Sequence, residues 1–165
     1  MTNVSTIGTL EVRLCMCLVL IVYQKQRDHK MGGYTEFLKG GKYVEAGVKY
    51  IFDNNYVSFV ELERLFSPYI TVKGDYCITH PTHRTIKYWC GVSKEFFEIF
   101  TKIKGHEGIT LAKATPLTYL TDGCIIKMEL AKRDNHPYKT DRWLPVVLAL
   151  QSKLKDHNNG GKNIC

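Results

Sequence analysis

The spacing of apolar residues changes at Pro68, and this change constrains the fold more than any other feature of the sequence. Before Pro68, apolar side chains recur every three or four residues, the period of a helix with one buried face. After it, apolar residues alternate with polar ones at the period of a strand, at Ile70, Val72, Tyr76 and Ile78. The sequence therefore predicts an α+β fold, with three helices packed on a mainly antiparallel β-sheet.

The first expected helix covers residues 34–52 and is interrupted by two glycines at 40 and 41. Its core-facing positions follow helical spacing and are Val44, Val48, Ile51 and Phe52. Ser58 and Glu61 have the spacing of a capping box, in which each side chain binds the exposed backbone N–H of the other. A second helix is therefore expected to begin after Ser58 and to end before the helix-breaking proline at 68.

A third helix is expected over residues 93–104, capped by Ser93 and ended by Gly105 in a left-handed conformation. The remaining periodic segments predict strands. These are a hairpin over 69–79 that turns at 73–75, a strand over 86–90, a strand over 109–112, a hairpin of 118–120 with 124–130, and a last strand over 143–150 with an edge or bulge at Pro145.

A winged-helix arrangement is the variant of this fold that two helices followed by a hairpin would allow. The simple form of that arrangement is disfavoured, because a strand pair rather than a recognition helix directly follows residue 66.

The length of 165 residues suits a single domain. We assign residues 31–152 to one α+β domain and residues 153–165 to a polar flexible tail. Residues 1–30 are an N-terminal extension or an added core strand, and they lie upstream of the true start if the chain begins at Met31. The apolar run over 14–23 has half of the roughly 20 residues that a membrane-spanning helix needs, so we expect no membrane association.

Six cysteines are too few for a disulfide scaffold, which reaches about 8–10% cysteine in small secreted domains. Cys77, Cys90 and Cys124 lie in apolar or strand-like segments, where a thiol usually behaves as a small buried hydrophobe. We therefore expect free thiols in a reducing, cytoplasmic location.

One short stretch carries the residue types of a zinc site, at Cys77, His80, His83 and Cys90. Structural zinc sites usually join two close pairs that are far apart in the sequence, whereas these four residues are neighbours. The favoured interpretation is a hairpin whose loop contains two histidines, and we expect no metal; zinc binding is the alternative.

Asp122, Glu129 and Lys132 resemble in spacing the acidic pattern of metal-dependent nucleases. Glu129 and Lys132 are three residues apart, so they would point to opposite faces of an extended strand unless a bulge intervened. The chain also lacks the G-x-S-x-G elbow, the G-x-x-x-x-G-K-[ST] phosphate loop and the G-x-G-x-x-G fingerprint. We therefore expect no catalytic residues and no cofactor, with a nuclease using Asp122 and Glu129 as the alternative.

The net charge of +7 is concentrated in the second half of the chain. Residues 1–82 carry 9 basic and 8 acidic side chains, whereas residues 83–165 carry 14 and 8. Basic side chains interleaved with aromatic ones are typical of surfaces that bind nucleic-acid phosphates and stack on bases. The sequence thus favours a non-enzymatic nucleic-acid-binding (DNA-binding or RNA-binding) or regulatory domain with phosphate contacts from Arg84, Lys87, Lys132, Arg133, Lys139 and Arg142. A module that binds an acidic protein partner is a further alternative.

Overall fold

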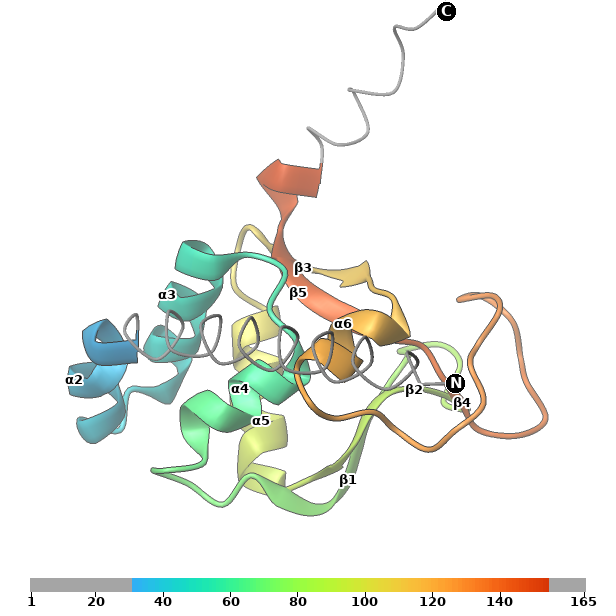
Figure 1. Ribbon diagram of the computed structural model, residues 1–165, viewed down its shortest axis with the longest axis horizontal. Helices are drawn as coiled ribbons and strands as arrows, with labels where there is room; N and C mark the ends of the chain where they lie inside the picture. The colour runs from blue at the N-terminus through green and yellow to red at the C-terminus, as the bar shows by residue number, and fades with distance from the viewer. Residues whose placement is uncertain (1–30, 155–165) are drawn as a thin grey trace, which may run out of the picture. The chain divides into compact units, whose positions relative to one another are not determined.

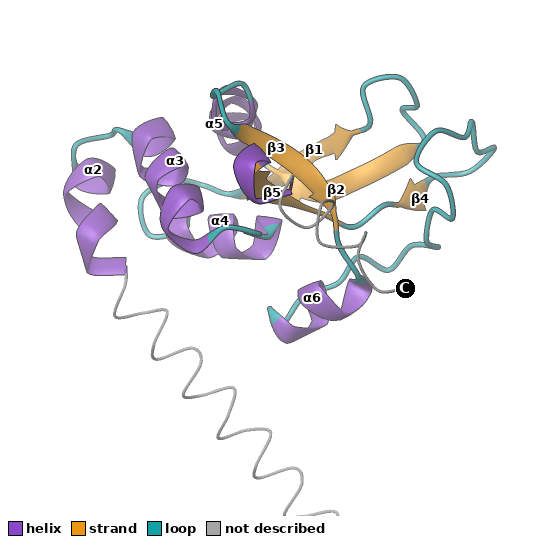
Figure 2. Ribbon diagram, turned by 90° about the horizontal axis from the view of Figure 1, so that it is seen from above, coloured by secondary structure: helices purple, strands orange, loops and turns teal. Residues whose placement is uncertain are grey.

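Residues 31–154 are described here in a computed structural model (Figures 1 and 2). The chain divides into two compact units, residues 1–35 and 36–165, and every strand of the described residues belongs to the second unit. The expectations for residues 1–30 and for most of the tail lie outside the described residues. No helix within 31–154 is long and apolar enough to cross a membrane.

The chain is a mixed α+β protein, as predicted. Its helices are η1 (Met31–Tyr34), α2 (Thr35–Lys39), α3 (Tyr43–Asn54), α4 (Phe59–Phe66), α5 (Lys94–Lys104) and α6 (Pro116–Thr121). Its strands are β1 (Lys73–Thr79), β2 (Ile86–Val92), β3 (Ile109–Lys113), β4 (Arg142–Trp143) and β5 (Val146–Leu150).

The strands form two small sheets instead of one. The first has the order β1-β2-β4, in which β2 pairs antiparallel with β1 and parallel with β4. The second contains β3 and β5, which pair antiparallel from Ile109↔Leu150 to Lys113↔Val146. In Figure 2, α3 and α4 lie toward one end of the strands, while β4 and its neighbouring loops lie at the other end.

The two predicted side-chain caps are confirmed. The Ser58 hydroxyl accepts from the backbone N–H of Glu61 while the Glu61 carboxylate accepts from the Ser58 N–H, so both halves of the capping box are present. The Ser93 hydroxyl accepts from the N–H of Phe96 at the start of α5. Gly105 ends α5 with a right-handed φ of −74°, so the predicted left-handed cap is wrong; its N–H bonds back to helical carbonyls as the chain turns onward.

The buried face of α3 differs from the predicted one. It consists of Ala46, Gly47, Tyr50 and Ile51, whereas Phe52 is 48% exposed. A Cβ on Gly47 would lie 2.4 Å from Cδ1 of Ile103 and 3.1 Å from Cζ of Phe66. The small residues therefore set this face, because they let α5 and α4 approach more closely than larger side chains would allow.

The hairpin predicted over 69–79 is wrong, because the expected turn lies inside β1. A Cβ on Gly74 would lie 2.8 Å from the Cα of Ser93 and 2.9 Å from the carbonyl oxygen of Val92. This glycine thus permits close approach of the neighbouring backbone rather than a chain reversal. The actual hairpin joins β1 to β2 through residues 80–85.

The hairpin predicted around Asp122 is also wrong. Pro116 occupies the first turn of α6, where its missing N–H costs nothing and its fixed φ favours the helix. Asp122 is the C-cap of this helix, and Gly123 follows with a φ of +87°, which glycine adopts readily. Residues 124–130 form no strand beyond a single bridge at Leu130.

Pro145 divides the predicted last strand. The residues before it form β4 in the first sheet and the residues after it form β5 in the second. Proline has no N–H for a ladder, so a change of sheet at this position removes no hydrogen bond. Its carbonyl accepts from the backbone N–H of Ala114 at 2.9 Å.

Packed aromatic side chains connect the β1-β2-β4 sheet to α4 and α6. Trp89 of β2 stacks on Phe59 of α4 and on Tyr119 of α6, with ring centroids 6.0 and 5.1 Å away. Trp143 of β4 meets the Tyr119 ring edge-on at 5.3 Å. All four rings are buried, so this cluster holds β2 and β4 firmly in place.

Candidate functional site

Parallel pairing of β4 with β2 joins two segments that are far apart in the sequence. Ile86 pairs with Arg142 and Lys87 with Trp143, and the Arg142 N–H donates to the Thr85 carbonyl at 2.8 Å. This pairing places residues 80–85, which connect β1 and β2, beside the loop 124–141, which leads into β4 (Figure 1). We call the six predicted phosphate contacts, which all lie on these two loops and on β2 and β4, the basic surface.

Two members of the basic surface are partly buried and paired with acids. Lys87 lies 3.5 Å from Asp141, and its side chain is 17% exposed. Arg142 is 28% exposed, forms an ion pair with Glu129, and lies 5.7 Å from the centroid of the Tyr138 ring. Their partners offset their charge, so these two cations serve to join the loop 124–141 to the sheet.

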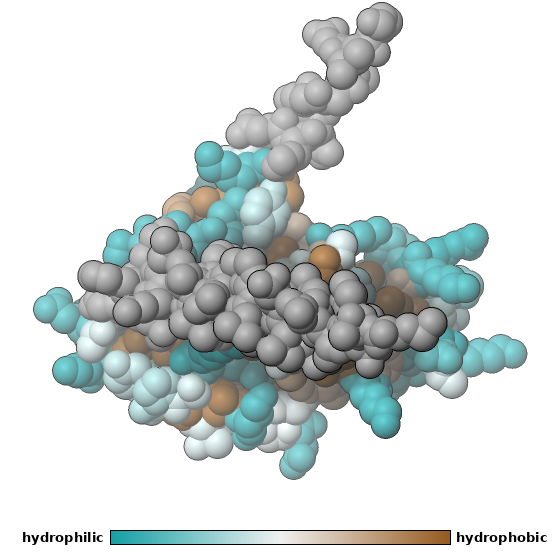
Figure 3. Space-filling view, viewed as in Figure 1, coloured by the Kyte–Doolittle hydropathy of each residue, from teal (hydrophilic) through white to brown (hydrophobic). Residues whose placement is uncertain are grey.

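The other four members are exposed: Arg84, Lys132, Arg133 and Lys139. None of them forms an ion pair within residues 31–154. Figure 3 shows hydrophilic side chains projecting at the right, on the side where Figure 1 shows the loop 124–141. These four side chains are therefore the ones available to an anionic partner.

Tyr138 fixes the shape of the loop that carries three of these cations. Its hydroxyl accepts from the Arg133 N–H at 2.8 Å and donates to the Arg133 carbonyl at 3.2 Å. The His136 ring meets the Tyr138 ring edge-on with centroids 4.8 Å apart. An aromatic pair thus lies among the basic side chains. The other aromatic rings that alternate with these cations in the sequence, Tyr88, Trp89 and Trp143, are buried and offer no stacking surface.

Two histidines shape the loop 80–85, which connects β1 to β2. Nδ1 of His80 accepts from the backbone N–H groups of Thr82 and His83, each at 3.2 Å, and the two imidazoles stack with centroids 5.3 Å apart. The His80 ring also contacts Tyr88, whose pKa is raised by burial and by the charge of Asp134. The pKa of Asp134 is lowered, mainly because Lys113 lies 2.9 Å from its carboxylate and donates a hydrogen bond to it.

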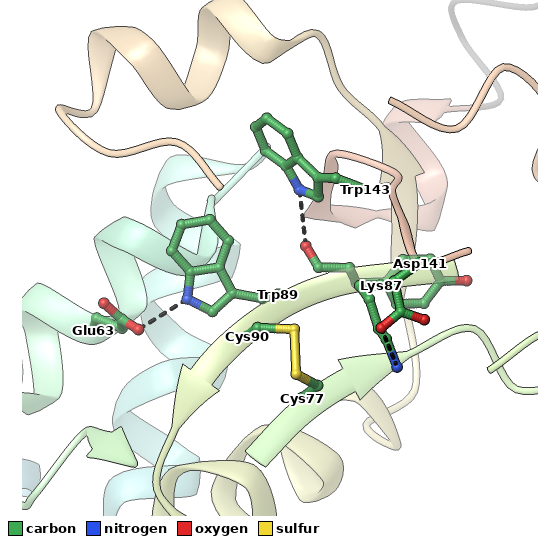
Figure 4. Close-up of a disulfide and its surroundings, with 8 residues drawn as sticks. Glu63, Cys77, Lys87, Trp89, Cys90, Asp141 and Trp143 are labelled. Atoms are coloured by element: carbon green, nitrogen blue, oxygen red, sulfur yellow. Dashed lines mark hydrogen bonds and ion pairs between the residues drawn. A yellow bond between two sulfur atoms is a disulfide. The ribbon is translucent and has the colours of Figure 1, made fainter. Parts of the chain in front are cut away.

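The cysteines of the zinc hypothesis are joined to each other. Cys77 and Cys90 face each other across β1 and β2, with Cα atoms 4.1 Å apart, and form a disulfide (Figure 4). The expectation of free buried thiols is therefore wrong for this pair, since strand register brings them within bonding range. Cys124 is free but exposed, because the strand expected to bury it does not form.

The acidic residues of the nuclease hypothesis lie in different environments. Asp122 is buried at the end of α6, where its carboxylate accepts a 2.6 Å hydrogen bond from the Ser58 hydroxyl and its carbonyl accepts from Arg64. Glu129 is exposed and is held by Arg142. Within residues 31–154, no three histidine, cysteine or acidic side chains are grouped as a metal site requires.

Sequence reasoning missed a cluster of polar contacts made by the buried side chains of Glu63, Trp89 and Trp143. The Trp89 indole and the Lys73 ammonium both donate to the Glu63 carboxylate. The Trp143 indole donates to the Tyr88 carbonyl at 3.1 Å, and Figure 4 shows the hydrogen bonds of both indoles. The sequence pattern did not indicate burial of Glu63, and it placed Trp89 on the same strand face as Lys87, yet Glu63 and Trp89 are both buried. Each indole N–H has an acceptor, and we assign the cluster to positioning of the strands.

Comparisons with protein-family models, with curated proteins and with solved structures found no match for this chain.

Proposed function

We propose that this protein is a non-enzymatic nucleic-acid-binding or regulatory domain that contacts phosphates through the four exposed cations of the basic surface. The observation that carries the proposal is the β2–β4 register, which brings Arg84 of one loop beside the loop of Lys132, Arg133 and Lys139. Cations without acidic partners can neutralise phosphates and release counterions, and this release drives binding.

The winged-helix variant would require an exposed recognition helix. In α4, every residue except Arg64 is buried, so this helix has no face to place in a groove. We therefore assign binding to the loops and to the ends of the strands. His136 and Tyr138 offer aromatic surface there, which favours single-stranded over duplex nucleic acid.

We also propose a cytoplasmic location. Six cysteines are few for an extracellular scaffold, and disulfides of cytosolic proteins are usually transient or regulatory.

The test is fluorescence anisotropy of labelled single-stranded and duplex DNA and RNA over about 50–200 mM salt. Affinity should fall steeply across this range, as counterion release requires. A variant with Lys132→Gln and Lys139→Gln should lower the slope of log affinity against log salt by about 2, because each phosphate contact contributes about 1. The matched control changes two exposed lysines of α5, Lys102→Gln and Lys104→Gln, and should leave the slope near that of the unchanged protein.

Three results would contradict the proposal. They are no binding at low salt, affinity that does not change with salt, and equal loss in the loop and control variants. Capture of an acidic peptide with no binding to any nucleic acid would instead support the protein-interaction alternative. Cleavage of the labelled strands would support the nuclease alternative.

A further inference from the structure

β1 has few buried side chains, and Lys73 at its start is joined to Glu63 of α4. It is an edge strand of its sheet, its residues 73–76 are exposed, and Ile78 is its one buried residue. β2 differs, because Ile86, Tyr88, Trp89 and Val92 on that strand are buried and because β4 pairs with its other edge. Side-chain packing therefore holds β2 far more firmly than β1.

Backbone pairing between β1 and β2 is also irregular. The register shifts between Tyr76 and Cys77 and again between Ile78 and Thr79. Two consecutive pairs lie between these shifts, Cys77↔Cys90 and Ile78↔Trp89. The disulfide thus joins the strands at the short regular part of the ladder, and the backbone pairing on either side of it is interrupted.

The same disulfide closes the chain segment that carries one side of the basic surface. Cys77 and Cys90 are 13 residues apart, and Arg84 lies in the loop between them. The loop 124–141 is held by other contacts, namely the β2–β4 pairing and the buried Trp143. Breaking the disulfide should therefore loosen β1 and residues 80–85 while leaving the loop 124–141 in place.

We propose that the Cys77–Cys90 pair is a redox switch that regulates the basic surface, an inference that rests on the proposed function. The reductant is a thiol: its thiolate attacks one sulfur, the Cys77–Cys90 bond breaks, and a mixed disulfide forms. A second external thiol then attacks the mixed disulfide and releases the cysteine that was bound in it as a free thiol. The net reaction converts two thiols into one external disulfide and transfers two electrons and two protons to the cysteine pair.

The oxidised protein presents Arg84 in an ordered loop, whereas the reduced protein must order that loop when it binds. The loop loses conformational freedom on binding only in the reduced protein, and a cost equal to that of immobilising one flexible side chain would weaken binding by about 2- to 12-fold. The salt dependence should change little, because the charges themselves are retained.

The experiment uses the full chain, oxidised or treated with dithiothreitol, with thiol trapping and peptide mass mapping to follow the 77–90 bond. Hydrogen–deuterium exchange should rise in residues 73–85 on reduction and stay constant in residues 130–143. The double variant Cys77→Ser, Cys90→Ser should exchange like the reduced protein with or without thiol. The control Cys124→Ser should respond to thiol as the unchanged protein does, because Cys124 is free and exposed.

Binding of a labelled single strand is then measured in both redox states. A roughly 2- to 12-fold weakening that accompanies loosening of residues 73–85 supports the switch. Equal affinity in the two states, unchanged exchange after reduction, or resistance of the bond to dithiothreitol in the folded protein would overturn it. Absence of binding in both states would overturn the proposed function, and the exchange data would still show whether the disulfide controls the loop. If the double variant does not fold, thiol treatment of the unchanged protein gives the same comparison.

Discussion

The indole Nε1 of Trp89 donates a 2.8 Å hydrogen bond to Oε1 of Glu63, and both residues are buried. Lys73 donates to the other oxygen of the same carboxylate. One acidic side chain on α4 thereby connects two strands of the β1-β2-β4 sheet. Because a buried carboxylate needs such donors, this pairing determines how the helix and the sheet are aligned.

Trp89→Phe should lower the free energy of unfolding by about 2–4 kcal/mol, because it removes a hydrogen bond to a charged group and some packing volume. The matched control is Trp143→Phe, since the Trp143 indole donates to a neutral carbonyl. Its loss should be smaller by about 1 kcal/mol. Urea denaturation measures both values, and equal losses would show that the charged acceptor adds nothing.

Gly47→Ala should destabilise the packing of α3 against α5. An added Cβ would clash with Cδ1 of Ile103, and overpacking of this kind costs about 1–3 kcal/mol. The higher helix propensity of alanine offsets up to about 1 kcal/mol of this loss of stability. Ile103→Val removes the clashing methyl group, so the double variant should be more stable than the sum of the two single effects predicts. Simple additivity in thermal or urea unfolding would show that the clash is relieved elsewhere.

Tyr119→Phe tests a buried phenol. Burial raises the pKa of Tyr119 above its ordinary value of 10.0, and its hydroxyl donates to the Val146 carbonyl at 2.5 Å. The folded state thus holds the proton more tightly than the unfolded state, so this stabilisation is complete below pH 10.0 and is lost at higher pH.

At neutral pH, Tyr119→Phe should cost about 1–3 kcal/mol through the unsatisfied carbonyl. Above pH 10.0 the difference in unfolding free energy between the two proteins should shrink by about 1.4 kcal/mol per pH unit. Urea denaturation as a function of pH measures this difference. Parallel curves for the two proteins would mean that Tyr119 titrates alike in both states.

The variants Asp122→Asn and Glu129→Gln distinguish a protein that only binds nucleic acid from a metal-dependent nuclease. Asp122 is engaged by Ser58 and Glu129 by Arg142, so neither carboxylate is arranged to share a metal ion with the other. We expect the unchanged protein and both variants to leave supercoiled plasmid intact with Mg²⁺ or Mn²⁺. Metal-dependent cleavage by the unchanged protein that is lost in both variants would make the enzyme hypothesis correct.

Local features of the fold could be predicted from sequence. The capping box of Ser58 and Glu61 and the cap at Ser93 were predicted correctly, because each depends on residues three positions apart. The errors at Gly74 and Asp122 have a different origin. Glycine and aspartate both favour turns. Gly74 instead lies in a strand, where its lack of a side chain lets the backbone of Val92 and Ser93 approach. Asp122 instead ends a helix that begins at Pro116.

For the candidate site, sequence identified the cations but not their roles. Arg84 and Arg142 are the same residue type, yet Arg142 pairs with Glu129 while Arg84 remains exposed. No residue spacing indicates such a difference, since it depends on contacts between segments that are distant in the chain.

The amino-acid sequence alone was enough to place the helices α3, α4 and α5, most strand-forming segments and the excess of positive charge, because hydrophobic period, side-chain caps and charge are properties of neighbouring residues. The folded chain was needed to learn which strands pair, that Cys77 meets Cys90, and which cations are paired with acids. Pairing and burial are set by the whole core, where one close approach between distant segments outweighs the weak preference of any single residue.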